Sequence, residues 1–275
     1  MNFLFDFAEP LIYALVVLSL FFCIKFAREH FLYDKTEDTH IAEHNFAIAL
    51  NLAGFYLAVG ITVMAALSGS DHDMIKDLLY VIGYSLLGVT LITLTTRLYF
   101  ISVFPDFKRY LRNDIPAAGI YAFGTQIAVA IVTLGAFHGD GTLLSSIVFF
   151  LLGQAGLFAS RYIWEYLNKL KVSGLIVDGN RAGIILHVMS SISLSIVMYA
   201  AVKGAFVSWE QDLYHYFKSF IVGVLFIMVV VNKLLDKLVM PDTDTKTEIE
   251  AYNYSSAFVI GSVQIALSII LIGIL

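Results

Sequence analysis

The feature that most constrains this chain is a series of long apolar runs that are nearly free of charge. A helix needs about 20 apolar residues to cross the hydrocarbon of a bilayer. Eight runs come near or reach that length, so we predict an all-α polytopic membrane protein with eight transmembrane helices. The predicted spans are Pro10–Ala27, Phe46–Ser70, Leu78–Phe100, Ile115–Phe137, Thr142–Tyr162, Ala182–Val202, Leu213–Lys233 and Ala251–Leu275.

Composition agrees with this interpretation and excludes other classes. Of the 275 residues 59% are hydrophobic and 14% are charged, whereas about a quarter are charged in soluble domains. The lipid bilayer is therefore the first predicted partner. The net charge is −5, and no basic patch with interleaved aromatic residues indicates nucleic-acid binding. Cys23 is the only cysteine, so no disulfide can form within the chain.

The basic residues predict the orientation of the helices. The connectors after the first, third, fifth and seventh spans, with the adjoining helix ends, hold 14 of the 17 Lys and Arg residues. The other side holds only Lys76, Lys203 and Lys218. Short connectors rich in Lys and Arg stay in the cytoplasm. We therefore predict that both termini lie on the non-cytoplasmic side.

A repeated unit of two helices accounts for the whole chain. Each unit has an odd-numbered span, a cytoplasmic connector and an even-numbered span that follows an asparagine. These asparagines are separated by 68, 67 and 73 residues, and they are Asn45, Asn113, Asn180 and Asn253. A regular period indicates internal duplication. Because each unit has two spans, the sequence predicts four parallel repeats related by an axis along the membrane normal.

The polar step before each even-numbered span has two interpretations. The asparagine side chain can cap the helix, and an anion is favoured at the same positive helix end. The nearby acidic residues are Glu43, Asp114, Asp178 and Glu250. The step is then a capping and packing device. In the alternative, the four acidic–Asn steps form a polar ring at a cytoplasmic vestibule.

Two stretches carry a resemblance to a known family. They are EHNFAIALNLAGFYLAVGI from Glu43 and DGNRAGIILHVMSSISLSIV from Asp178. With their acidic–Asn start and small-residue helix, they resemble the YjfL-like bacterial inner-membrane proteins (domain of unknown function 350). The resemblance implies two tandem four-helix units, residues 1–139 and 140–275, in a bacterial inner membrane. Met189 stands where the first stretch has Gly54.

Polar residues inside the spans are the candidates for function, because burying them in lipid is costly. They are Asn51, Gln126, Gln154, His187 and Gln264, with Arg97 and Arg161 nearer the cytoplasmic face. Asn51 lies six residues after its asparagine and His187 seven, so the sequence indicates near-equivalent positions. We expect a channel-like or transporter-like protein with a polar path between the two units. In the alternative, these side chains only hold helices together.

Two further functions stay open. The connectors Arg28–Ala42 and Leu238–Thr247 would suit a scaffold that presents them to a cytoplasmic protein, for example in envelope stress. The sequence also leaves open whether the protein forms a homo-oligomer.

A more remote alternative is a metal-dependent enzyme, since His40, Glu43 and His44 match the H-x-x-E-H pattern of one zinc peptidase class. The other repeats lack these histidines, and Glu43 has a capping explanation. The chain has no phosphate-binding glycine-rich loop, no nucleophile elbow and no cysteine pair. The sequence therefore favours a protein that is not an enzyme and gives no reason to expect a cofactor.

Overall fold

The computed structural model describes residues 3–27, 39, 42–68, 74–138, 142–203, 206–231, 234 and 245–274. Within these residues the regular structure is helical. The long helices are α1 (Phe3–Ala27), α3 (Phe46–Leu67), α4 (Met74–Val103), α6 (Pro116–Phe137), α7 (Leu143–Asn168), α9 (Arg181–Val202), α10 (Trp209–Gly223) with the π-helix η2 (Val224–Val231), and α13 (Tyr254–Ile272). Three short helices, α5 (Phe107–Arg112), α8 (Val172–Val177) and α12 (Thr245–Glu250), precede α6, α9 and α13.

The eight predicted spans are confirmed as eight apolar helical segments. Seven are long and apolar enough to cross a membrane, and the apolar part of α1, Leu11–Ala27, is shorter. The span that Lys218 interrupts is a single crossing, Trp209–Val229, which passes from α10 into η2. Most boundaries differ from the predicted ones by a few residues. Helices α4 and α7 extend beyond their apolar runs, whereas α3 ends earlier and α13 begins later than predicted.

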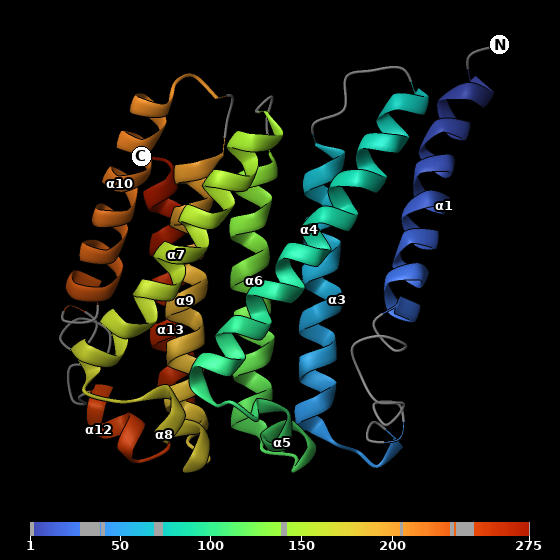
Figure 1. Cartoon of the computed structure of the whole chain (residues 1–275). Coiled ribbons are helices and arrows are strands. Elements are labelled where there is room, and N and C mark those ends of the chain that lie inside the picture. Colours follow the sequence, from blue (N-terminus) through green and yellow to red (C-terminus); the bar gives the residue numbers. More distant parts are fainter. Residues whose placement is uncertain are drawn as a thin grey trace.

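The helices form two layers (Figure 1). The most extensive contacts join α3 to α6, α6 to α9, and α9 to α13, so these four helices stand in a row and are called the row helices below. The second layer covers the junctions of the row. Helix α4 contacts both α3 and α6, and α7 contacts both α6 and α9. The short helices lie at one end of the molecule, and the start of α1 and the end of α13 lie at the other (Figure 1).

The same turn leads into each row helix. Asp114, Gly179 and Tyr252 have left-handed φ values of 49°, 65° and 60°, and His44 has 63°. The following N–H group bonds back across the end of the short helix, from Ile115 to Tyr110, from Asn180 to Leu175 and from Asn253 to Glu248. This is the Schellman pattern of helix ends. The residue after the left-handed one is therefore the structurally equivalent first residue, the N-cap, of every row helix.

This equivalence corrects the register of the second repeat. The N-cap of α6 is Ile115, whose side chain makes no capping hydrogen bond, and Asn113 instead ends α5. The prediction that Asn113 caps its span is therefore wrong. Pro116 supplies the physical reason, since a proline in the first turn needs no N–H partner and has the right φ for a helix start.

Neighbouring row helices approach closely at one repeated crossing. Position 9 after the N-cap of one helix meets position 8 after the N-cap of the next. The three crossings are Gly54 with Phe123, Gly124 with Val188, and Met189 with Gly261. A Cβ atom on Gly54 would lie 2.7 Å from the Phe123 Cα atom. Each crossing has one glycine, on one side or the other, so backbones can come close.

One large core extends from α3 through α13. A second, smaller cluster joins α1 to α3 and α4, with Leu20 and Ile24 against Phe55, Val59 and Val89. Helix α1 leaves much of its apolar surface uncovered, including Leu11, Leu15, Leu18 and Phe22, which are 53–63% exposed. The first helix is therefore attached to the edge of the row rather than enclosed by it.

Candidate functional site

Three of the four predicted asparagine caps are confirmed. The Oδ1 atom of Asn45 accepts from Ile48 N at 2.8 Å, and that of Asn180 accepts from Gly183 N at 3.0 Å. Asn253 accepts from the N–H groups of Ser255 and Ser256. Asn45 and Asn180 are both only 6% exposed.

The amide nitrogens of two caps also join one repeat to the next. Asn45 Nδ2 donates to the carbonyls of Leu111 and Arg112 at the end of α5. Asn180 Nδ2 donates to the carbonyl of Ile249 in α12 at 2.8 Å. The first repeat is thus tied to the second and the third to the fourth. Ile115, at the equivalent position, has no side-chain amide that could join the second repeat to the third.

The four acidic residues do not form one ring of equivalent groups. Asp114 Oδ1 accepts from Ala47 N of α3 at 2.9 Å and so caps a helix of the preceding repeat. Asp178 ends α8, and Glu250 lies 3.7 Å from Lys246 within α12. Glu43 is exposed in the turn before Asn45. Asp114 thus uses its carboxylate on a row helix of another repeat.

The H-x-x-E-H motif does not continue as a helix through His44. His44 has a positive φ, so it lies in the turn and not on a helix face. His40 lies outside the described residues. Among the described residues, no group of three or more His, Cys, Asp or Glu side chains is arranged to hold a metal ion.

The two intramembrane arginines have different environments. Arg97 is exposed on α4. Arg161 of α7 is 6% exposed, and its Nη1 atom donates to Ser102 Oγ of α4 at 2.5 Å. Its guanidinium lies 3.8 Å from Glu165 Oε1 and 4.6 Å from the centre of the Tyr162 ring. Arg161 is therefore a charge held between the last turns of α4 and α7.

Four of the predicted polar residues form separate contacts between neighbouring helices. Gln126 Nε2 donates to Asn51 Oδ1 at 2.7 Å, between α6 and α3. Ser190 Oγ donates to Gln264 Oε1 at 2.7 Å, between α9 and α13. Gln154 Nε2 donates to the Val129 carbonyl at 3.2 Å, between α7 and α6. The first two contacts lie within the first and second halves of the chain, and only the third joins the halves.

His187 is not the counterpart of Asn51. Counted from the N-caps they differ by one position, which turns them to different neighbours. Asn51 faces α6, the next row helix, whereas the His187 ring stacks on Tyr121 of α6, the preceding row helix, at 5.9 Å. The second neighbour of His187 is Trp164 of α7, whose ring centre lies 4.9 Å away. The equivalent pair is instead Gln126 and Gln264, each eleven residues after its N-cap.

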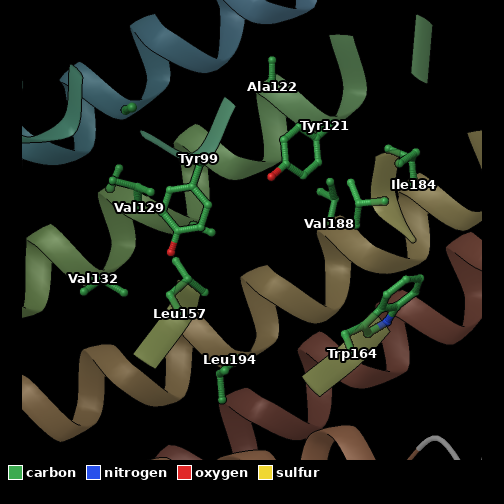
Figure 2. Packing of buried hydrophobic residues seen from close by; sticks show 14 of the residues in the cluster. Tyr99, Tyr121, Ala122, Val129, Val132, Leu157, Trp164, Ile184, Val188 and Leu194 are labelled. Carbon is green, nitrogen blue, oxygen red and sulfur yellow. The ribbon is translucent and has the colours of Figure 1, made fainter. Parts of the chain in front are cut away.

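Gln154, Arg161 and His187 lie at the junction of α4, α6, α7 and α9. Three aromatic residues that the sequence did not indicate as site residues lie there too. Tyr99, Tyr121 and Trp164 lie there among aliphatic side chains such as Val188 and Leu157 (Figure 2). Tyr99 donates from its hydroxyl to the Gln154 carbonyl at 3.1 Å. Their signal in the sequence is weak, because aromatic residues are common throughout the spans.

Several buried polar atoms at this junction have no hydrogen-bond partner among the described residues. They include Trp164 Nε1, His187 Nδ1, Arg161 Nε and Gln154 Oε1. A buried unpaired donor or acceptor costs about 1–3 kcal/mol. The side chains of Trp164 and Arg161 can only donate hydrogen bonds. The junction therefore offers two donor groups, one of them positively charged, among aromatic rings. This chemistry suits a small anion or an ordered water. We name these four residues the junction site.

Comparison with known proteins gives the same organisation in two halves. The family model described as Domain of Unknown Function (DUF350) matches residues 2–137 and again residues 140–275. A relative, the UPF0719 transmembrane protein of Aquifex aeolicus (strain VF5), is 22% identical over 249 residues, which are 88% of this chain and 90% of the relative. No solved structure matches the chain. With both halves matched, the chain is a multi-pass membrane protein that belongs to the DUF350 family.

Proposed function

We propose that the protein moves a small anion across the membrane, and that the junction site binds this anion between the two halves of the chain. The observation that carries the proposal is the set of unpaired, deeply buried donors on α7, next to the unpaired ring nitrogen of His187. Polar groups at membrane depth mark ion and solute pathways, because lipid penalises them unless they serve a purpose.

The charge at the junction sets the expected preference for anions. Arg161 is buried to 6% exposure, while its partner Glu165 is partly exposed and reaches it at 3.8 Å. Glu165 also accepts from Val172 N at 3.0 Å. The carboxylate is therefore hydrogen-bonded to a backbone donor and not to Arg161, whose Nε–H group is left to donate to an incoming anion. Basic side chains line pores that select anions.

Gln154 extends the polar groups of the junction deeper along α7. It lies seven residues before Arg161 and keeps an unpaired Oε1 atom. Seven residues of helix span about 10 Å. The buried polar groups of α7 would thus accompany a solute from the end of the helix toward its middle.

Flux measurements test the proposal. Purified protein in liposomes would be given gradients of chloride, nitrate, acetate or phosphate, each alone. We expect flux of at least one of these anions, and a decrease of roughly ten- to a hundredfold in Trp164→Phe, since loss of one hydrogen bond to a charged group costs about 1.5–3 kcal/mol. Arg161→Gln should lower flux at least as much.

The matched control is Arg97→Gln, because Arg97 is an exposed arginine near the end of α4. That variant should keep the wild-type flux. Absence of flux for all four anions with folded protein would refute the proposal, as would equal losses in Arg97→Gln and Arg161→Gln.

We also propose a bacterial inner-membrane location with the short helices in the cytoplasm and both termini outside. The support is the excess of Lys and Arg in the connectors at the short-helix end. The test places single cysteines in a Cys23→Ser background, at the exposed positions Lys169 and Val207. An impermeant maleimide applied to intact cells from the outside should label Val207→Cys and spare Lys169→Cys. The reverse pattern would invert the topology.

A second candidate is a scaffold that binds a cytoplasmic protein. This function is favoured by the fixed positions of α5 and α12, whose carbonyls accept hydrogen bonds from Asn45 and Asn180. In that case, serine at the exposed Lys108 and Arg109 should abolish cellular function while liposome flux remains. If cellular function survives these substitutions, and also survives scrambling of the sequences of the connectors Arg28–Ala42 and Leu238–Thr247, the scaffold hypothesis is wrong.

A further inference from the structure

The row of helices is built by one interface used three times. At each crossing, position 9 after the N-cap of one row helix meets position 8 after the N-cap of the next. The contact recurs near both ends of the helices. Gly119 packs on the backbone of Ala47, and Gly135 packs on Tyr199. We call the side of each row helix that meets the next one its forward face.

The forward face has small residues at the same positions in all four row helices, with Met189 as the one exception. We count four positions from the N-cap, at 2, 9, 13 and 20. In the first three helices these positions are buried or partly buried, and in α13 all four are exposed. The residues are Ala47, Gly54, Ala58 and Ala65 in α3; Ala117, Gly124, Ala128 and Gly135 in α6; Ala182, Met189, Ser193 and Ala200 in α9; and Ser255, Ser262, Ala266 and Gly273 in α13.

Lipid tails pack against large side chains as well as small ones, so contact with lipid does not require this pattern. Small residues at regular spacing are what allows helix backbones to approach in a membrane. In α13 the pattern is present, but no row helix of the described chain covers it. The forward face of α13 therefore has the composition of an interface whose partner is missing.

Among the residues that the structure describes, no row helix occupies the complementary place at the opposite edge of the row. Ala53 of α3 stands at position 8 after Asn45, where Phe123, Val188 and Gly261 stand in the other row helices, and it is exposed. A Cβ atom on Gly60, about two turns further along the same side, would meet nothing within 4 Å. The helices α3 and α13 lie at opposite ends of the row (Figure 1).

Helix α1 shows the same missing neighbour. In the second layer, α4 lies against the two row helices α3 and α6, and α7 lies against α6 and α9. Helix α1 has α3 as the one row helix in its cluster, and Leu11 and Leu15 are both 61% exposed. A further row helix beside α3 would complete the groove in which α1 lies.

We propose that the missing neighbour is a second copy of this chain, with α13 of one copy packed on α3 of the next. The interface continues the one already used inside the molecule, with Ser262 at position 9 against Ala53 at position 8. It is head-to-tail, so the copies form a ring if the rotation closes and an open chain if it does not. This assembly is independent of the junction site.

Disulfide cross-linking in native membranes tests the proposal. The variant Ala53→Cys with Ser262→Cys would be made in a Cys23→Ser background. Within one copy two row helices stand between these positions, which separates them by roughly 24 Å or more at 8–10 Å per helix pair. A disulfide needs Cα atoms within about 7 Å, so any bond must join two copies. We expect dimers and higher bands on a non-reducing gel, several-fold above the control.

The control pair is Ala53→Cys with Ile269→Cys. Ile269 is 59% exposed on α13 but lies seven residues beyond Ser262, about 10 Å further along the helix, so it is not level with Ala53. Equal cross-linking of the two pairs would overturn the proposal. Efficient cross-linking of Ser262→Cys alone would also overturn it, because two α13 helices would then pair symmetrically.

A second measurement does not depend on cysteine chemistry. Light scattering of the detergent-solubilised protein should give the mass of an oligomer. Ala266→Trp, on the forward face of α13, should lower that mass, whereas Leu151→Trp, at an exposed position of α7 outside the row, should not. A monomer mass for the wild-type protein, together with absent cross-links in membranes, would refute the assembly.

Discussion

At the scale of single residues, Asn45 and Asn180 use both ends of one amide. The oxygen caps the residue's own helix and the nitrogen binds the end of a short helix in the next repeat. The capping by the oxygen could be predicted from sequence, because capping depends on neighbouring residues in the chain. The hydrogen bond from the nitrogen could not, because it depends on which helices lie side by side. Asn113 shows the limit of the local argument, since Pro116 moves the helix start beyond it.

The asparagine network predicts a difference between two asparagines. Asn45→Ala removes a cap and two hydrogen bonds to buried or partly buried carbonyls. A lost cap costs about 1 kcal/mol, and each hydrogen bond between membrane helices adds about 0.6–1.7 kcal/mol. We expect a loss of about 2–4 kcal/mol in unfolding free energy, measured by denaturation in mixed detergent micelles.

Asn113→Ala is the matched control for this measurement. Its side chain is exposed and caps no helix, so the change should stay within about 0.5 kcal/mol. Similar losses in both variants would contradict the structural roles given to the two asparagines.

At the scale of helices, the crossing of each row pair is conserved in place while the glycine changes sides. The first two crossings have the glycine on the earlier helix, at Gly54 and Gly124, and the third has it on the later helix, at Gly261 against Met189. From sequence, Met189 in the place of Gly54 looks like a departure from the family pattern. The structure shows a compensated exchange, which sequence could reveal only once the facing position was known.

Glycine substitutions should have opposite effects at packed and open positions. A Cβ atom on Gly54 would lie 2.7 Å from Phe123 Cα, whereas one on Gly83 of α4 would meet nothing within 4 Å. Overpacking a close interface costs about 1–3 kcal/mol, while alanine is the better helix former by about 1 kcal/mol. We expect Gly54→Ala to lower the midpoint of thermal unfolding in detergent and Gly83→Ala to leave it unchanged or raise it. A lower midpoint in both variants would show that the crossing is not the limiting contact.

At the scale of the whole molecule, the number of spans follows from sequence and their arrangement does not. Hydropathy is a property of one segment, so eight spans can be counted along the chain. Whether α6 contacts α9 depends on pairs of faces. The polar residues illustrate this, because Asn51 and Gln264 turn out to bind within their own halves, and only the Gln154, Arg161 and His187 contacts join the halves. A polar path along all seven predicted residues is therefore not the arrangement that the contacts give.

The predicted division at residues 139 and 140 leads to a last test. Within each half, an asparagine amide joins two repeats, and between the halves that bond is missing because Ile115 replaces the asparagine. The halves are nevertheless joined by the packing of α6 on α9, which is about as extensive as that of α3 on α6. Residues 1–139 and 140–275, expressed as two chains in the same cell, should therefore each insert and purify together through a tag on one chain.

The helix contact at Gly124 makes this test specific. A Cβ atom there would overlap Val188 of the other half, so Gly124→Leu should weaken co-purification. Gly54→Leu is the matched control, because its crossing with Phe123 lies inside the first half. If the two wild-type halves do not co-purify, the four repeats fold as one cooperative unit. If Gly54→Leu weakens co-purification as much as Gly124→Leu, the halves are not held together through the α6–α9 crossing.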